Sequence, residues 1–127
     1  MPALFRKLRD ENYVPQIWAS QWFLTFFAAY FPVEITSRIW DIYLVEGRKT
    51  IFRFALAILK INEAALLKAD LEGLFTILKD YGQKADFDKL MEVAFKGFTF
   101  SRSLITKYET EHSESPKEAI LNLCYLP

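Results

Sequence analysis

Apolar residues recur three and four positions apart along almost the whole chain, and no stretch alternates apolar and polar residues over the length of a strand. This period is typical of amphipathic helices that share a core. Four glycines and five prolines leave room for helices with few breaks. A length of 127 residues suits one domain. The sequence therefore predicts an all-α fold, an orthogonal multi-helix bundle, as a single domain over residues 1–127.

Start and stop signals divide this pattern into helices. Ser, Thr, Asp and Asn favour the N-cap position, and Pro favours the first turn. Side chains of the capping type stand at Thr50, Asn62, Asp70, Asp86, Ser101 or Ser103, and Ser115. Gly47 and Gly82 are placed to end helices. We expect helices over about 2–12, 15–29, 32–46, 51–61, 63–69, 71–81, 87–97, 102–111 and 116–126.

The expected helix over 15–29 is apolar nearly all round. Such a helix is typically buried on every side. We therefore expect it at the centre of the bundle. Near the C-terminus, Phe95, Phe98, Phe100 and Cys124 are expected to be core residues, because aromatic side chains and a lone thiol are usually buried.

Composition limits the kinds of partner. Sixteen basic residues offset sixteen acidic ones, so the broad positive field of a nucleic-acid-binding domain is missing. The apolar fraction of 52% and aromatic fraction of 17% are high. These residues fill an unusually aromatic core, or they form apolar faces that contact another protein. Composition alone leaves both possibilities open.

The longest apolar stretch, residues 17–31, is too short to span a bilayer. The N-terminal residues become charged too early for a secretory signal. A lone cysteine cannot form an internal disulfide. We therefore expect an intracellular, cytoplasmic protein without a membrane span, and peripheral recruitment to a membrane stays open.

Residues that carry chemistry are scarce. One histidine, His112, and one cysteine, Cys124, provide neither a Cys/His metal cluster nor a Ser-His-Asp arrangement. The four scattered glycines form no phosphate-binding loop. Asp86 and Asp88 fit the solvated start of a helix better than a pair for acid–base catalysis. We expect no catalytic residues, no metal and no cofactor.

Several motifs occur in a fixed order: the run ASQWFLTFF at 19–27, Phe31-Pro32, RIWDIYLVEG at 38–47 and FRFALAILK at 52–60. Together they resemble the C-terminal half of a TBC domain, the Rab GTPase-activating module. The resemblance covers about residues 4–81 and gives no guidance for the helices over 84–127. It implies an all-helical fold and a connection to small GTPases of membrane traffic.

The residues that carry the resemblance are Ser20, Gln21, Trp22, Phe23, Pro32, Arg38, Trp40, Asp41, Glu46 and Gly47. A structural role explains them first. Aromatic side chains on an apolar helix pack in a core, and residues three apart on a helix can pair. We expect Trp40 to pack beneath an Arg38–Asp41 pair.

TBC proteins resemble one another in using an arginine from an I-x-x-D-x-x-R motif and a glutamine from a Y-x-Q motif, both in the N-terminal half. Here Tyr81-Gly82-Gln83 fits Y-x-Q, and Ile77-x-x-Asp80-x-x-Gln83 fits the arginine motif except at its last position. These two fragments overlap and follow the other motifs instead of preceding them. We therefore expect Gln83 to be non-catalytic and the N-terminal half to be missing.

Two hypotheses about function remain. In the first, the chain is part of a TBC-type Rab GTPase-activating protein and has no catalytic power alone. Its partner is then a Rab-type GTPase or the missing N-terminal half. Apolar faces that this half would otherwise cover are then exposed, so we expect the chain to self-associate. In the second, it is a TBC-like structural or interaction subunit of a larger assembly without a GTPase. A peripheral membrane bundle is disfavoured, because no helix joins a strongly basic face to a large apolar one.

Overall fold

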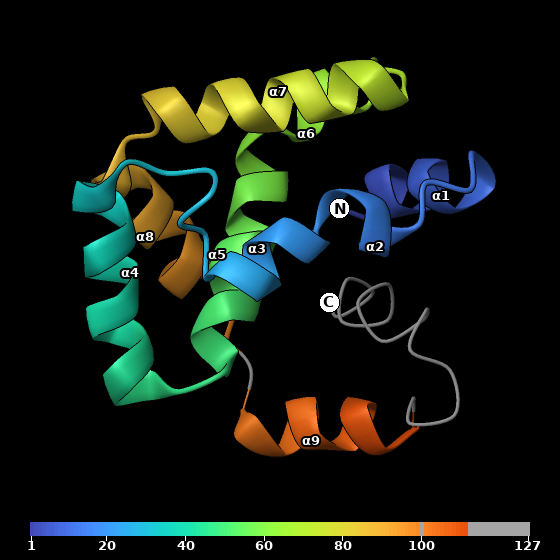
Figure 1. The fold of residues 1–127 in the computed structure, drawn as a ribbon. Helices are drawn as coiled ribbons and strands as arrows, with labels where there is room; N and C mark the ends of the chain where they lie inside the picture. The colour runs from blue at the N-terminus through green and yellow to red at the C-terminus, as the bar shows by residue number, and fades with distance from the viewer. Residues whose placement is uncertain (100, 112–127) are drawn as a thin grey trace.

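The computed structural model describes residues 1–99 and 101–111. The helix expected over 116–126 lies outside this part, as do Phe100, His112 and Cys124. The described residues form helices and connecting segments only, which confirms the all-α prediction (Figure 1). The helices are α1 (Pro2–Asp10), α2 (Pro15–Trp18), α3 (Ser20–Thr25), α4 (Val33–Glu46), α5 (Lys49–Ile61), α6 (Glu63–Leu66), α7 (Leu71–Lys84), α8 (Phe87–Gly97) and α9 (Arg102–Glu111).

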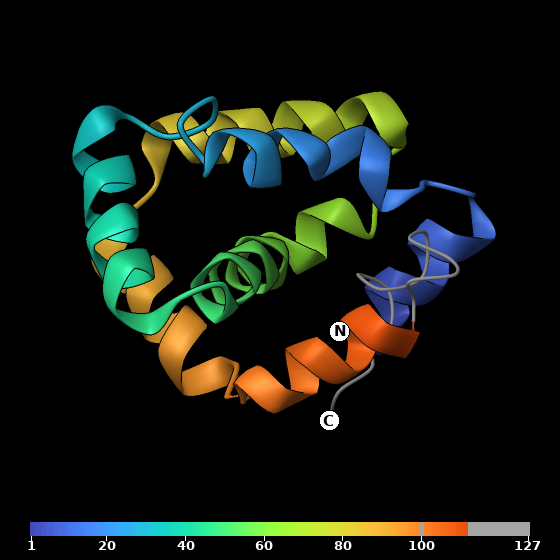
Figure 2. The ribbon, with the colours of Figure 1, turned by 60° about the horizontal axis from the view of Figure 1, so that its bottom comes forward.

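The central helix is α5. It packs against α3, α4, α6 and α8, and the other helices surround it (Figure 2). Every residue from Arg53 to Leu59 is buried. The expectation that residues 15–29 form the central helix is therefore wrong.

Residues 15–29 do not form one helix either. The helical path breaks at Ala19 and ends at Thr25, and Phe26 and Phe27 adopt left-handed backbone conformations with φ of 48° and 68°. Each such conformation costs of the order of 1 kcal/mol for a bulky residue. Burial of the Phe27 ring, 6.0 Å from both the Trp22 and Phe31 rings, offsets this cost.

Three of the predicted N-caps are confirmed. The Asp70 carboxylate accepts a hydrogen bond from the Gly73 amide at 2.8 Å, and Asp86 accepts one from the Asp88 amide at 2.9 Å. Ser101 accepts one from the amide of Leu104 at 3.3 Å. These bonds satisfy amides that a helix leaves unpaired in its first turn.

The predicted cap at Thr50 is wrong. Helix α5 begins at Lys49, so Thr50 lies inside it, fully buried, and its hydroxyl has no hydrogen-bond partner among the described residues. Asn62 does occupy the predicted N-cap position of α6, but its side chain forms no capping bond and donates to the Ile58 carbonyl oxygen at 2.8 Å. This local bond to the preceding turn competes with the cap.

Gly82 does not end its helix, because α7 continues to Lys84. It is buried against the backbone of Tyr30: a Cβ at this position would lie 2.3 Å from the Tyr30 carbonyl oxygen. The glycine therefore permits a close helix–turn contact. This contact fixes the turn that leads into α4.

Lys7 joins the start of the chain to α6. Its ammonium donates to the carbonyl oxygens of Leu66 and Leu67, each at 3.1 Å, and to that of Ala69. These carbonyls lie at the C-terminal end of α6, where a positive charge is stabilising. Lys7 thus positions α1 on the rest of the bundle.

Candidate interaction surface

The SQWF run of α3 lies largely in the core. Trp22 is 1% exposed, and its ring lies 5.6 Å from that of Trp18 and 5.9 Å from that of Tyr30, both edge-on. Phe23 packs on Phe52 at 5.3 Å. Ser20 is half-buried and Gln21 is exposed. The aromatic residues of this motif hold α3 against its neighbours.

The RIWD run lies on α4, where Arg38 spans to α8. Its guanidinium lies 3.9 Å from the centre of the Phe87 ring and 3.7 Å from the Asp88 carboxylate. Asp41 is exposed and forms no ion pair with Arg38 in the described part of the chain. The predicted Arg38–Asp41 pair is therefore wrong, because the stacked position over Phe87 turns the guanidinium toward α8.

Trp40 is 45% exposed, so it does not pack beneath that pair as expected. Its indole Nε1–H donates to the carbonyl oxygen of Phe26 at 2.9 Å. Phe26 is one of the two consecutive phenylalanines with a left-handed backbone. The indole therefore secures the sharp turn after α3 and leaves its ring at the surface.

The end of α4 is fixed by Glu46 and Gly47. The Glu46 carboxylate lies 2.5 Å from Lys49 and 3.5 Å from Arg53. The hydrogen bond from Lys49 holds the pKa of the Glu46 carboxyl below its usual value. Gly47 has a φ of 79°, which favours glycine and ends the helix where the sequence predicted. Pro32 occupies the N-cap position at the other end.

Helix α4 also carries an exposed apolar strip. Val33 is 73% exposed, Leu44 is 80% exposed, and Trp40 stands between them. With Ser37 these residues are spaced i, i+4, i+7 and i+11, so they follow one side of the helix. We call Val33, Ser37, Trp40 and Leu44 the α4 face.

Two shallow cavities adjoin the α4 face. One of about 270 Å³ lies between Phe26, Trp40, Tyr43 and Leu44. The other, of about 260 Å³, lies between Trp40, Val33 and residues around Phe31. Apolar side chains that line hollows on a helix surface are suited to contact another protein.

The sequence did not distinguish this face. Ile39 and Trp40 are adjacent and both apolar, yet Ile39 is buried and Trp40 is 45% exposed. Adjacent residues on a helix point about 100° apart. Two adjacent apolar residues therefore lie on different sides of the helix. This was the sequence signal that α4 has a second apolar side.

The two fragments that imitate the catalytic motifs lie on α7 against the Tyr30 turn. Gln83 donates from Nε2 to the Tyr30 carbonyl oxygen at 3.3 Å. The Tyr81 ring contacts the Phe31 ring edge-on at 6.4 Å, and burial raises the pKa of Tyr81 to about 12. Its hydroxyl has no hydrogen-bond partner among residues 1–99 and 101–111. Both side chains have structural contacts on the Tyr30–Phe31 turn.

Two further kinds of site are absent from the described residues. No group of three or more His, Cys, Asp or Glu side chains there is placed to hold a metal ion. No helix in this part is both long and apolar enough to cross a bilayer.

Comparison with known proteins places these features in a family. The family model described as Rab-GTPase-TBC domain matches residues 1–67, which include α1 to α6 and hence both motif helices. No solved structure matches the chain significantly.

Curated relatives include the human "Ecotropic viral integration site 5 protein homolog", 33% identical over 116 residues, which cover 89% of this chain and 14% of that protein. The yeast Saccharomyces cerevisiae "GTPase-activating protein GYP5" is 42% identical over 79 residues, 62% of this chain and 9% of that protein. The Caenorhabditis elegans "Rab GTPase-activating protein eat-17" is 35% identical over 89 residues, 69% of this chain and 10% of that protein.

The chain thus spans a small part of each of these three relatives, 14% at most. The family model, by contrast, covers a little over half of the chain itself, from its first residue to the end of α6. The chain belongs to the Rab-GTPase-TBC domain family.

Proposed function

We propose that this chain is part of a GTPase-activating protein for Rab GTPases and that it provides binding surface and structural support, without the catalytic groups. Family membership supports the first part, together with relatives whose names describe GTPase activation. The observation that carries the second part is the α4 face. Large apolar side chains exposed in a row on the helix of the RIWD run are typical of a surface that contacts a protein.

The chemistry of GTP hydrolysis explains the assignment of a non-catalytic role. An inserted arginine neutralises charge that develops on the transferred phosphoryl group, and a glutamine orients the attacking water. The arginine is worth on the order of 10³ to 10⁵ in rate. Here Gln83 is bonded to a backbone carbonyl, and Arg38 is engaged by Phe87 and Asp88. A chain that offers neither finger gives a bound GTPase little acceleration.

The test is binding to a panel of Rab GTPases, each loaded with GDP or with a non-hydrolysable GTP analogue. We expect one or more to bind in a nucleotide-dependent way. Leu44→Glu places a charge on the α4 face and should weaken that binding at least tenfold. Ile17→Glu, at an apolar side chain 49% exposed on α2, is the matched control and should change it less than twofold.

The contrary result is that no Rab binds in either nucleotide state. If the purified protein then holds another, non-GTPase protein on the α4 face, the second hypothesis, a TBC-like structural subunit, replaces the first. Exposed apolar surface is compatible with both partners, so nucleotide dependence is the observation that separates them.

A further inference from the structure

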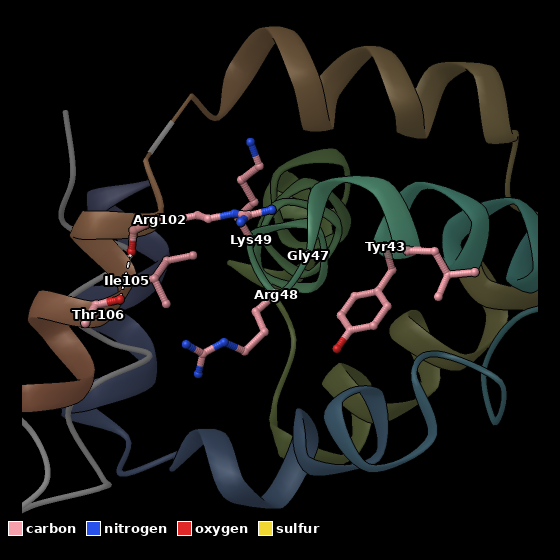
Figure 3. A pocket seen from close by; sticks show the side chains of 8 residues that line it. Tyr43, Gly47, Arg48, Lys49, Arg102, Ile105 and Thr106 are labelled. Atoms are coloured by element: carbon pink, nitrogen blue, oxygen red, sulfur yellow. Dashed lines mark hydrogen bonds between the residues drawn. The ribbon is translucent and has the colours of Figure 1, made fainter.

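A cavity of about 430 Å³ opens where the end of α4, the start of α5 and α9 meet. Figure 3 shows Tyr43 directed toward it from α4 and Arg102 reaching toward Lys49 from α9. The side chain of Arg48, from the connection between α4 and α5, extends into the same space (Figure 3). Tyr43, Leu44 and Gly47, which line one side of the cavity, belong to the RIWDIYLVEG run, and Leu44 is also part of the α4 face. The cations on the other side, Arg48, Lys49 and Arg102, have no part in the family motifs or the proposed function.

Three cations line the cavity, and they come from two segments: Arg48 and Lys49 are neighbours at the start of α5, and Arg102 begins α9. Arg102 donates from Nη2 to the Glu46 backbone carbonyl oxygen at 3.2 Å. It forms no ion pair with a carboxylate within residues 1–99 and 101–111. A guanidinium whose hydrogen bond goes to a neutral carbonyl keeps further N–H donors for an anion.

Two carboxylates face these cations. Glu46 pairs with Lys49 at 2.5 Å and with Arg53 at 3.5 Å, and Glu109 pairs with Arg48 at 2.7 Å. The Arg48–Glu109 pair is open to water, with side chains 62% and 41% exposed, so it is weak. Cations still outnumber carboxylates here, and a more highly charged anion can displace Glu109 from Arg48.

The backbone contributes little to this charge. The amides of Thr50 and Ile51 in the first turn of α5 donate to the carbonyl oxygens of Gly47 and Arg48, each at 3.1 Å, and the C-terminal end of α4 lies at the same cavity. The positive charge therefore comes from the side chains. The Tyr43 ring and the buried Ile105 give the cavity an apolar wall. Cations beside an aromatic side chain can bind a small organic molecule that carries an anionic group.

We infer that this cavity binds a small ligand with a phosphate monoester. Arginine matches phosphate in a bidentate manner, and a dianion gains from three converging cations where a monoanion gains less. The phosphate can belong to a soluble ester or to a lipid headgroup. This site goes beyond the proposed GTPase regulation and does not depend on it.

The test is calorimetric titration of the protein at low salt with inositol trisphosphate, with inorganic phosphate as competitor. We expect saturable binding that inorganic phosphate reduces. Arg102→Gln should weaken binding about tenfold, since charged hydrogen bonds to phosphate are strong. Lys49→Gln, on the central helix, should also weaken it and does not depend on how α9 is held. Lys96→Gln, which removes an exposed lysine on α8, is the control and should change it less than twofold.

Glu109→Gln provides the sharpest comparison, because it releases Arg48 from its carboxylate. If the cavity is a ligand site, this variant should bind inositol trisphosphate more tightly than the unchanged protein. If the cluster is purely structural, the variant should not bind inositol trisphosphate. Vesicles of phosphatidylcholine with phosphatidylinositol bisphosphate distinguish a lipid headgroup from a soluble ester. Binding to the vesicles indicates a lipid headgroup. Binding to inositol trisphosphate without binding to the vesicles indicates a soluble ester. The inference is overturned if inositol trisphosphate shows no saturable binding, or binds Arg102→Gln, Lys49→Gln and the unchanged protein equally.

Discussion

Gly82→Ala tests the packing that positions α4. A Cβ at residue 82 would meet the Tyr30 carbonyl oxygen at 2.3 Å and its carbonyl carbon at 3.0 Å. Real Cβ atoms do not approach that closely, and a backbone atom cannot rotate away as a side chain can. Helix α7 or the Tyr30 turn must therefore shift by about 1 Å, the kind of overpacking that costs about 1–3 kcal/mol.

Alanine also favours helix over glycine by about 0.8–1 kcal/mol. Because the clash is with backbone atoms, we take the upper part of the overpacking range, about 2–3 kcal/mol, and the net loss of unfolding free energy for Gly82→Ala is then about 1–2 kcal/mol. With a urea slope of about 1–3 kcal/mol per molar, the unfolding midpoint should fall by about 0.3–2 M. Urea unfolding followed by tryptophan fluorescence measures this change.

Gly97→Ala is the matched control. Its added Cβ would meet Val93 Cγ1 at 4.0 Å, an ordinary contact, and residue 97 is exposed at the end of α8. Only the helix preference then acts, so the midpoint should stay or rise. If Gly82→Ala is as stable as the unchanged protein while Gly97→Ala behaves as expected, α7 does not pack on the Tyr30 carbonyl and the reasoning fails.

Three further changes have defined outcomes. Trp40→Phe removes the hydrogen bond to the Phe26 carbonyl at 2.9 Å and should cost about 0.5–1.5 kcal/mol in urea unfolding; an unchanged midpoint would show that the bond does not hold the turn. Glu46→Gln should flatten the acid side of the stability profile. Because Lys49 lowers the folded pKa of Glu46, its contribution is present above the ordinary value of 4.5 and is lost as the pH falls below it; equal acid unfolding of both proteins would contradict this. Tyr81→Phe should leave stability at pH 7 unchanged or higher, because the hydroxyl has no partner in the described part. Above pH 10 the unfolded state loses the Tyr81 proton first, so the unchanged protein should lose stability up to about pH 12, and the variant should lose less.

Local signals predicted much of the helical framework. Asp70, Asp86 and Ser101 act as N-caps because each lies before an apolar run whose first amides need acceptors. Gly47 ends α4 because a left-handed residue was needed there. These features depend on a few neighbouring residues, and a sequence displays them directly.

Features set by tertiary contacts were missed. Nothing local indicates that Phe26 and Phe27 turn left-handed, since the gain comes from ring contacts formed only in the folded core. Gly82 carries the usual signal of a helix end, yet it serves a close approach to Tyr30, distant in sequence. The partner of Arg38 lies on α8, which the spacing within α4 could not reveal.

The candidate surface was partly predictable. A surplus of apolar residues indicated either an aromatic core or a contact face, and the structure contains both: Trp22 is buried, whereas Leu44 is exposed. Which apolar residue of α4 faces outward depends on where α5 lies. The converging cations at the cavity near α9 were not predictable, because Arg48 and Arg102 are far apart in sequence.

We propose above that this chain contacts a Rab GTPase through the α4 face. The decisive experiment is native mass spectrometry of the protein purified from its source, with its bound partners retained. We expect a complex with a Rab-type GTPase that Leu44→Glu reduces and Ile17→Glu preserves. A GTPase-free assembly, unchanged by Leu44→Glu, would contradict it.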